Sequence, residues 1–190
     1  VGYTNAGKSS LLNLLSGADV LAEDKLFATL DPTSRRLRFP REHEVIITDT
    51  VGFIRDLPKS LFAAFRATFE EAEDADLLLH VVDIGDLAHE LHMQTTEALL
   101  TELGLDQVPR LVVYNKSDQL IPGHAAAIAR STNAVAVSAL DRASLGPLLG
   151  RINEELFENH GVDVVGTVAP LPVVVDDEDD SGAMPWEDAR

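Results

Sequence analysis

Cysteine is absent from the 190 residues of this sequence, which excludes disulfide bonds and thiolate metal sites. The sequence also lacks any run of 18 apolar residues, so we expect no transmembrane helix. Basic residues are few, because 15 Lys and Arg stand against 32 Asp and Glu, and the formal net charge is −17. A surface this acidic repels phosphate backbones at long range. A nucleic-acid contact would therefore need a local basic patch or a segment outside this chain.

The densest group of basic residues is the segment RRLRFPR, which contains Arg35, Arg36, Arg38 and Arg41. Basic side chains on a strand commonly face solvent and protect the edge of a sheet. We therefore interpret this segment as a solvent-facing strand edge, with a local nucleic-acid contact as the alternative.

Strands and helices are predicted to alternate along most of the chain. The segments RRLRF and EVIITD predict a β-hairpin. Continuous apolar runs, typical of strands covered on both faces, occur in DLLLHVVD, RLVVYN and AVAVS. Helices are predicted over residues 8–16, closed by Gly17, and over 59–73, 87–103, 122–130 and 144–158. This order predicts an α/β fold, in which a mostly parallel β-sheet carries helices on both faces.

The composition divides the chain into three parts. We predict one folded domain over residues 1–160 and a short extension over 161–175 that could add edge strands. Residues 176–190 contain the run DDEDDSG and are predicted to be a disordered acidic tail.

The segment GYTNAGKS at residues 2–9 fits the phosphate-loop pattern G-x-x-x-x-G-K-[ST] at every fixed position. Gly2 and Gly7 allow a tight backbone whose N–H groups point at phosphate oxygens. Lys8 would place a cation between the β- and γ-phosphates, and Ser9 would offer a hydroxyl to Mg²⁺. The remaining residues of the predicted cradle are Tyr3, Thr4, Asn5 and Ala6.

A second phosphate-facing segment is DTVG, at residues 49–52. Asp49 ends the strand EVIITD, where its carboxylate could hold a Mg²⁺-bound water. The N–H of Gly52 could contact the γ-phosphate. Thr50 and Val51 lie between them and complete the predicted contact.

The long segment between the first helix and the hairpin contains LFATLDPT, in which a threonine hydroxyl could reach Mg²⁺ when a γ-phosphate is bound. The spacing alone leaves Thr29 and Thr33 as competitors. The predicted contact residues around the first of these are Phe27, Ala28, Leu30 and Asp31.

The segment NKSD at residues 115–118 follows the strand RLVVYN and suits guanine. Asp118 can accept from the N1–H and the 2-amino group together, whereas adenine has neither donor. Asn115 can bond the purine edge and brace the phosphate loop, while the stem of Lys116 can lie over the base. Ser117 completes the motif. One β-unit later, a backbone N–H in the segment SAL could reach the guanine oxygen, from Ser138, Ala139 or Leu140.

Together these motifs resemble the P-loop GTPases of the translation-factor class, and within it the HflX family of ribosome-associated GTPases. The resemblance covers roughly residues 1–158 and is most specific in FATLDPT and DTVGFIRDLP. The Obg family is the nearest alternative but lacks the GFIRDLP extension. The resemblance implies Thr29 rather than Thr33 as the switch residue. It also implies Lys8, Thr29 and Gly52 as catalytic residues and Ser9, Thr29 and Asp49 as metal ligands.

The resemblance further implies GTP and GDP as ligands, Mg²⁺ as cofactor, GTP hydrolysis and the large ribosomal subunit as partner. Members of the family are associated with ribosome splitting or rescue, and we expect a monomer in the cytoplasm, with a peripheral position at the membrane as the alternative. The family carries an N-terminal domain that has no counterpart here, and only Val1 precedes Gly2. We therefore expect a G-domain fragment with a truncated first strand. The missing domain would make most of the ribosomal contacts.

Phe53 stands where many nucleotide hydrolases carry a glutamine that orients the attacking water. One hypothesis is that intrinsic hydrolysis is slow and that a rearrangement induced by the ribosome stimulates it. We rank a catalytic contribution from Arg55 of the same chain below this rearrangement. A competing hypothesis is that Phe53 packs beneath the following helix.

A rival function for the protein is a nucleotide-dependent binding module with negligible hydrolysis. A further alternative function is that of an ATPase or a small-molecule kinase, and the NKSD motif argues against it.

Three histidines raise the question of a metal site. His89 and His92 are three apart on a predicted helix, a spacing that zinc sites use. No cysteine or carboxylate group converges with them in the sequence, so we interpret them as surface or partly packed residues. His80, within LLLHVV, is predicted to be a core residue with its hydrogen bonds satisfied.

Overall fold

The computed structural model describes residues 1–17, 33–39, 43–50, 52–53 and 69–158. Within these ranges the chain forms two groups of hydrogen-bonded strands. The predicted extension and acidic tail, residues 161–190, lie outside the described part of the chain, as do residues 59–68 of one predicted helix.

The three parallel strands are β3 (Leu78–Asp83), β4 (Arg110–Asn115) and β5 (Val135–Ala136), in the order β3-β4-β5. The register pairs Leu78 with Arg110 and Asp83 with Asn115, so the carboxyl ends of β3 and β4 are level. β5 is shorter than the predicted AVAVS strand. The pairing nevertheless continues beyond it, since the Val137 N–H donates to the Tyr114 carbonyl at 2.8 Å.

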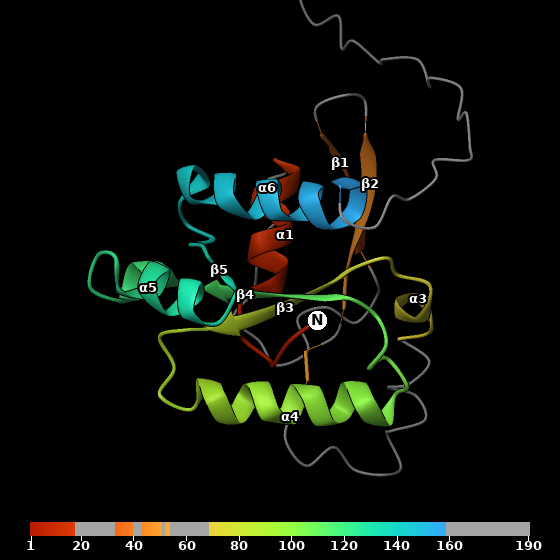
Figure 1. Ribbon diagram of the computed structural model, residues 1–190, viewed down its shortest axis with the longest axis horizontal. Coiled ribbons are helices and arrows are strands. Elements are labelled where there is room, and N and C mark those ends of the chain that lie inside the picture. Colours follow the sequence, from red (N-terminus) through yellow and green to blue (C-terminus); the bar gives the residue numbers. More distant parts are fainter. Residues whose placement is uncertain (18–32, 40–42, 51, 54–68, 159–190) are drawn as a thin grey trace, which may run out of the picture.

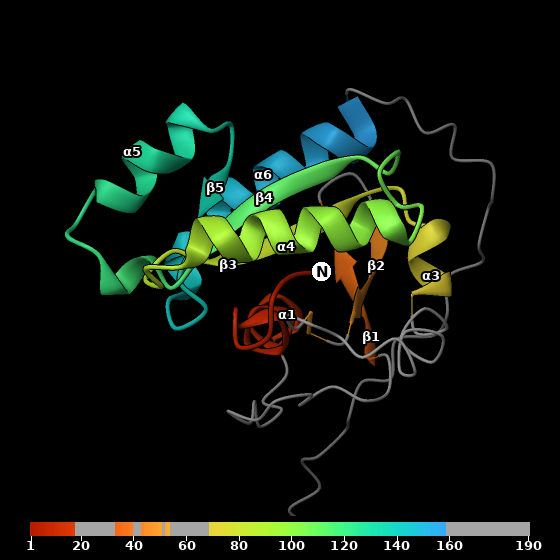
Figure 2. The same ribbon diagram turned by 90° about the horizontal axis from the view of Figure 1, so that it is seen from below.

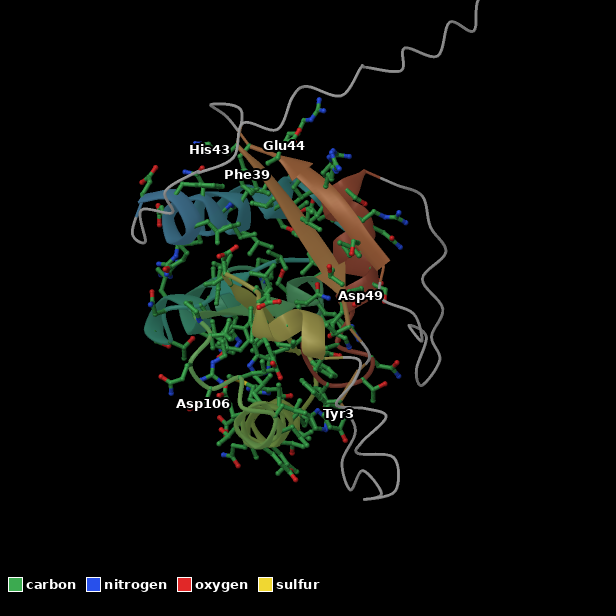
Figure 3. The ribbon with its side chains drawn as sticks, turned by 90° about the vertical axis from the view of Figure 1, so that its right-hand side faces the viewer. Tyr3, Phe39, His43, Glu44, Asp49 and Asp106 are labelled. Atoms are coloured by element: carbon green, nitrogen blue, oxygen red, sulfur yellow. The ribbon has the colours of Figure 1, made fainter. Side chains whose placement is uncertain are left out.

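The predicted hairpin is confirmed as β1 (Thr33–Arg38) and β2 (Glu44–Asp49), which pair antiparallel. Leu37 and Phe39 are buried, whereas Arg36 and Arg38 are exposed on the alternate face. Figure 3 shows that Phe39, His43 and Glu44 lie at one end of the hairpin and Asp49 at the other.

Residues 1–3 connect the hairpin region to the parallel strands. The Val81 N–H donates to the Val1 carbonyl at 2.9 Å, and Tyr3 forms a parallel bridge with Phe53. The Phe53 N–H donates to the Gly2 carbonyl at 3.1 Å, and the Thr4 N–H donates to the Phe53 carbonyl at 2.7 Å. The chain after β2 is therefore fixed directly to the beginning of the predicted phosphate loop.

Helices cover both faces of the parallel strands, as predicted. In Figure 1, α4 (His89–Glu102) lies on one side, and α1 (Lys8–Ser16) and α6 (Gly146–Asn153) lie on the other. Figure 2 shows α4 lying over β3 and β4. The remaining helices in the described part of the chain are α3 (Glu70–Glu73) and α5 (His124–Ser131), with short 3-10 segments at Ser117–Gln119 and Arg142–Leu145 and a π-helical end at Glu154–Glu158.

Apolar side chains of the described residues form three clusters around the parallel strands. The largest joins the hairpin, α1, α6 and the strands, and includes Leu11, Leu37, Val113, Leu148 and Ile152. The cluster beneath α4 includes Phe53, Phe69, Leu78, Leu100 and Leu105. A third cluster packs α5 through Val82, Ile84, Tyr114, Ala125 and Ala129. These contacts hold the carboxyl ends of the strands beside the loop at residues 2–9.

In the described part of the chain, no helix combines the length and the apolar character needed to cross a membrane.

Candidate functional site

The loop before α1 has an unusual backbone. Gly2 has φ 148°, Asn5 has φ 60° and Gly7 has φ 87°. A Cβ on Gly2 would lie 2.2 Å from the Val81 oxygen, and a Cβ on Gly7 would lie 2.3 Å from Nδ2 of Asn115. Glycine is required at both positions, because the backbone has a positive φ and neighbouring atoms leave no room for a Cβ. The loop therefore has the tight form that a phosphate cradle needs.

Lys8 and the pair Ser9–Asp49 lie at the end of this loop. The Lys8 amine donates to the Tyr3 carbonyl at 3.2 Å. Burial lowers the pKa of Lys8 to about 8, and the Asp49 carboxylate opposes that shift. The Ser9 hydroxyl donates to Asp49 Oδ2 at 2.5 Å, although 40 residues separate the two in the sequence.

The Ser9–Asp49 pair fits a magnesium site. A hydroxyl and a buried carboxylate are hard oxygen donors, and Mg²⁺ in phosphate sites commonly takes one or two protein groups together with substrate phosphates and waters. Among the residues that the structure describes, no group of three or more His, Cys, Asp or Glu side chains could hold a metal. The donor set therefore suits Mg²⁺ shared with a phosphate rather than an all-protein metal cage.

Gly52 lies against the loop. A Cβ at this position would be 2.9 Å from the Thr4 Cα and 3.1 Å from the Lys8 amine. No side chain can be added there without moving the loop backbone, so Gly52 and the loop form one surface. Thr50, between Asp49 and Gly52, has a buried hydroxyl without a hydrogen-bond partner among the described residues.

Asn115 joins three segments through one amide. Its Nδ2 donates to the Ala6 carbonyl at 2.9 Å, and its Oδ1 accepts from the Ala139 N–H at 3.0 Å. The side chain is 1% exposed, so both bonds are shielded from water. The predicted brace between NKSD and the phosphate loop is therefore present, and it also includes the segment SAL.

Asp118 and Ser138 form the other side of the predicted base site. The Ser138 hydroxyl donates to Asp118 Oδ1 at 2.5 Å and accepts from the Leu140 N–H at 3.2 Å. The Ser138 N–H donates to the Ser144 hydroxyl at 2.9 Å. These bonds orient the Asp118 carboxylate and leave its second oxygen for another donor.

Lys116 has a partner that the sequence reasoning missed. Its backbone is left-handed, with φ 61°, and its amine lies 2.7 Å from Asp83 Oδ2. Asp83 Oδ1 in turn accepts from the Gly85 N–H at 3.0 Å. The position of Asp83 at the end of a buried strand, level with Asn115, was the available signal, because ligand sites collect at carboxyl ends of parallel strands.

Some predicted residues cannot be placed. Phe27, Ala28, Thr29, Leu30, Asp31 and Val51 lie outside the described residues, as does Arg55. Thr33 begins β1, and its side chain is not described. The structure brings together the remaining predicted groups, from the phosphate loop, the end of β2, NKSD and SAL, through the contacts given above.

Phe53 does not face this site. Its side chain is 0% exposed and stacks on Phe69, with ring centroids 5.0 Å apart and an interplanar angle of 14°. It belongs to the apolar cluster beneath α4. The packing hypothesis for Phe53 is therefore the one that the geometry favours.

His80 is buried as predicted, but the prediction that its hydrogen bonds are satisfied is wrong. Its Nδ1 lies 3.4 Å from Glu97 Oε1 without forming a hydrogen bond, and it has no partner among the described residues. Burial lowers the pKa of His80 to about 3, so the ring is neutral at physiological pH. A neutral ring avoids the larger cost of an unpaired buried charge.

Comparison with protein families gives one match over most of the described domain. A family model described as a 50S ribosome-binding GTPase matches residues 1–116.

Curated relatives from two bacteria are both named GTPase HflX. The relative from Caldanaerobacter subterraneus subsp. tengcongensis is 49% identical over 160 residues, which cover 83% of this chain and 36% of the relative. The relative from Alkalihalophilus pseudofirmus is 56% identical over 128 residues, which cover 65% of this chain and 30% of the relative. This chain thus spans about a third of the length of these relatives.

Solved structures of GTP-binding proteins have the same fold. A GTP-binding protein from Sulfolobus solfataricus in complex with GDP is 28% identical, with TM-score 0.65, over 81% of this chain and 50% of that one. A variant of Era from Aquifex aeolicus bound to GDP·AlF4⁻ is 26% identical, with TM-score 0.68, over 90% and 60%. Era in complex with MgGDPNP and part of 16S ribosomal RNA is 27% identical, with TM-score 0.66, over 81% and 54%.

Proposed function

Because this chain belongs to the HflX family of P-loop GTPases, we propose that it binds GTP and GDP and hydrolyses GTP with Mg²⁺. The observation that carries this proposal is the Asn115 amide, which bonds to both Ala6 and Ala139. These two bonds hold a phosphate-type loop and a guanine-type motif in one fixed arrangement. GDP complexes among the similar structures support the same nucleotide.

The phosphate end of the proposed site consists of residues 2–9 with Asp49 and Gly52. Backbone N–H groups of the loop and the Lys8 ammonium hold the phosphates. Ser9 and Asp49 would hold Mg²⁺, which when bound neutralises charge on the phosphates. Thr29 is proposed as the switch ligand that completes this set.

The base end consists of residues 115–118 and 138–140. Asp118 would accept from the N1–H and the 2-amino group of guanine, while Lys116 covers the base, held by Asp83. Ser138 keeps the Asp118 carboxylate in place. The N–H of Leu140 is already donated to Ser138, and that of Ala139 to Asn115. A contact from this segment to the guanine oxygen would require one of these N–H groups to be shared with the base.

Hydrolysis is proposed to be slow in the isolated chain. Phosphoryl transfer depends mainly on positioning and charge stabilisation, which the loop, Lys8 and Mg²⁺ provide. The side chain of Phe53 offers no hydrogen bond to a water and is buried away from the site. We therefore expect that a docked partner supplies or orders the missing group.

The proposed partner is the large ribosomal subunit, and the proposed role is ribosome splitting or rescue by a monomeric cytoplasmic protein. The description of the matching family as ribosome-binding supports the partner. The splitting role is carried by the family resemblance alone. Segments of the full-length relatives that this chain does not span would contribute to these contacts.

A second candidate function is a nucleotide-dependent binding module with negligible hydrolysis. The specific observation in its favour is that Phe53 faces the apolar cluster instead of the nucleotide. In this case GTP and GDP would control partner binding, and turnover would have no role.

Single-turnover hydrolysis of GTP distinguishes the two functions. We expect a low rate with the chain alone and an increase of about tenfold or more when purified large subunits are added to a protein extended to the full length of its relatives, as a docked partner supplies charge or water positioning. ATP serves as the matched control nucleotide and should not be hydrolysed. Tight GTP binding with no hydrolysis in either condition would favour the binding module, and preferential ATP binding would contradict the proposed function.

The pKa of Lys8 gives a pH-dependent prediction. Because burial lowers this pKa to about 8, the nucleotide-free amine loses its charge as the pH rises through that value. Phosphate binding favours the charged form, so above that pH binding must take up a proton and GDP affinity should fall, by up to about tenfold per pH unit. Calorimetry between about pH 7 and pH 10 measures the slope.

The control for this slope is Lys8→Met. That variant should bind GDP more weakly at every pH and should lose the fall in affinity above about pH 8. An identical slope in the variant would assign the titration to another group.

A further inference from the structure

The phosphate loop adopts a conformation that needs support from its surroundings. Gly2, Asn5 and Gly7 all have positive φ within six residues. A non-glycine residue with φ near 60° is held there by its neighbours, since an unsupported chain avoids it. Asn115 supports the end of the loop through Ala6, and backbone bonds from Phe53 support its start. The side of the loop that faces α4 needs a separate contact.

That side is incompletely packed. A cavity of about 50 Å³ lies between residues 3–6 of the loop, the end of β3 and the first two turns of α4. His80 and Thr96 line it, and each has a buried polar atom without a partner among the described residues. A cavity of this size admits water but gives the loop backbone no dense packing.

The side chain of Tyr3 crosses from the loop to α4. Its ring stacks on the imidazole of His92, with ring centroids 3.8 Å apart and an interplanar angle of 7°. Figure 3 shows Tyr3 beside α4. The Nδ1 of His92 lies 3.4 Å from Asp86 Oδ2, so these two side chains are neighbours. Asp86 accepts from the Ala88 N–H at 2.8 Å through Oδ1, which fixes the carboxylate at the start of α4.

The backbone carbonyl of Tyr3 also accepts a hydrogen bond from the Lys8 amine. A rotation of the Tyr3 residue would therefore change both the loop backbone and the position of the proposed phosphate-binding cation. From the sequence, His89 and His92 were interpreted as surface or partly packed residues, with a zinc pair as the alternative. In the structure His89 instead contacts the Asp86 carbonyl through Nδ1, at 2.8 Å.

We propose that His92 is a positioning residue for the phosphate loop. It acts through Tyr3: the stacked imidazole, next to Asp86, fixes Tyr3 and thereby holds the loop and Lys8 in the nucleotide-binding form before the ligand arrives. This inference rests on the proposed function for its effect on nucleotide affinity. The positioning of the loop itself can be measured without nucleotide.

The test compares His92→Ala with His92→Phe in the whole 190-residue chain. The alanine variant removes the ring, and we expect it to raise the dissociation constant for GDP about three- to tenfold, the range of one stacked ring pair. The phenylalanine variant keeps a planar ring against Tyr3 and should bind GDP within about twofold of the unmodified chain. Gln94→Ala, at an exposed position of the same helix, is the matched control and should change nothing.

A second readout uses the nucleotide-free chain. Hydrogen exchange of the amides at residues 3–7 should become faster in His92→Ala and return to normal in His92→Phe. If the unmodified chain binds no GDP, the proposed function fails, but faster exchange in the alanine variant would still support positioning. Unchanged exchange and unchanged GDP affinity in the alanine variant would overturn the inference. A loss of thermal stability without either effect would overturn it too, because His92 would then be only structural.

Discussion

Asp118→Asn is expected to weaken GDP binding by about a thousandfold or more, because a site built to hydrogen-bond one base strongly rejects a mismatched partner. The carboxylate can accept from both the N1–H and the 2-amino group of guanine. An amide offers one acceptor, and its NH₂ would face the 2-amino group, so two donors would meet with no acceptor between them. Xanthine carries an oxygen at that position, so affinity for xanthosine diphosphate should rise in the same variant. Titration with both nucleotides measures the exchange of preference.

The structure supplies a control for this substitution. Ser138 donates to Asp118 Oδ1, and an amide oxygen can accept the same bond, so the variant should retain its folding stability. Asp141→Asn makes the same chemical change nearby, where the carboxylate accepts from the Ala143 N–H. It should leave GDP affinity unchanged. Normal GDP binding by Asp118→Asn would show that residues 115–118 do not read the base.

Phe53→Gln is expected to lower the free energy of unfolding by about 3–5 kcal/mol, the usual range for loss of a buried phenylalanine ring. The side chain is 0% exposed and stacks on Phe69, so a glutamine would lose this packing and bury an amide without a partner. Urea unfolding gives the loss of stability. Hydrolysis per folded molecule should stay unchanged, because the side chain does not reach the phosphate end.

Phe53→Leu is the matched control. It keeps an apolar side chain in the same cluster and should cost about 1–2 kcal/mol, less than the glutamine variant. The competing hypothesis predicts the opposite pattern: a glutamine that faces the nucleotide would raise the rate of GTP hydrolysis with little loss of stability. Faster hydrolysis by Phe53→Gln in the absence of any partner would therefore contradict the packing assignment.

The elements that the sequence predicted well are those encoded by neighbouring residues. Helix α1 ends at Ser16 and is capped by Gly17, whose φ of 69° is the left-handed conformation that glycine favours at a helix end. The hairpin followed from two short runs separated by the segment PREH, and its pairing was confirmed. In both cases the determining interactions lie within about 20 residues, so a local pattern contains them.

The last predicted helix shows where the pattern of neighbouring residues was too coarse to give the detailed structure. The predicted helix over 144–158 is instead a 3-10 turn at Arg142–Leu145, α6 from Gly146, and a π-helical end. Asp141 caps the first turn by accepting from the Ala143 N–H, and Pro147 lacks an N–H to extend the preceding hydrogen bonds. Both residues were visible in the sequence, and a proline in the first turn is a known local signal for the start of a helix.

Several contacts between distant elements were not predicted, although the brace from Asn115 to the phosphate loop was. The pairing of Lys116 with Asp83 depends on the register of β3 against β4, and the stack of Tyr3 on His92 depends on how α4 crosses the sheet. The unpartnered Nδ1 of His80 depends on the packing of several elements around it. The motifs therefore predicted which residues gather at the site, while tertiary packing decides which neighbours hold them in place.

The Asn115 amide also fixes a distance. One planar group donates to Ala6 at the phosphate end and accepts from Ala139 at the base end. Aspartate lacks the donor, and glutamine would displace both atoms by the length of a methylene group, so neither reproduces the two bonds. The separation between the two ends is thus built into a single side chain. If the proposed function holds, this fixed separation would favour ligands in which the sugar between base and phosphate has the matching span.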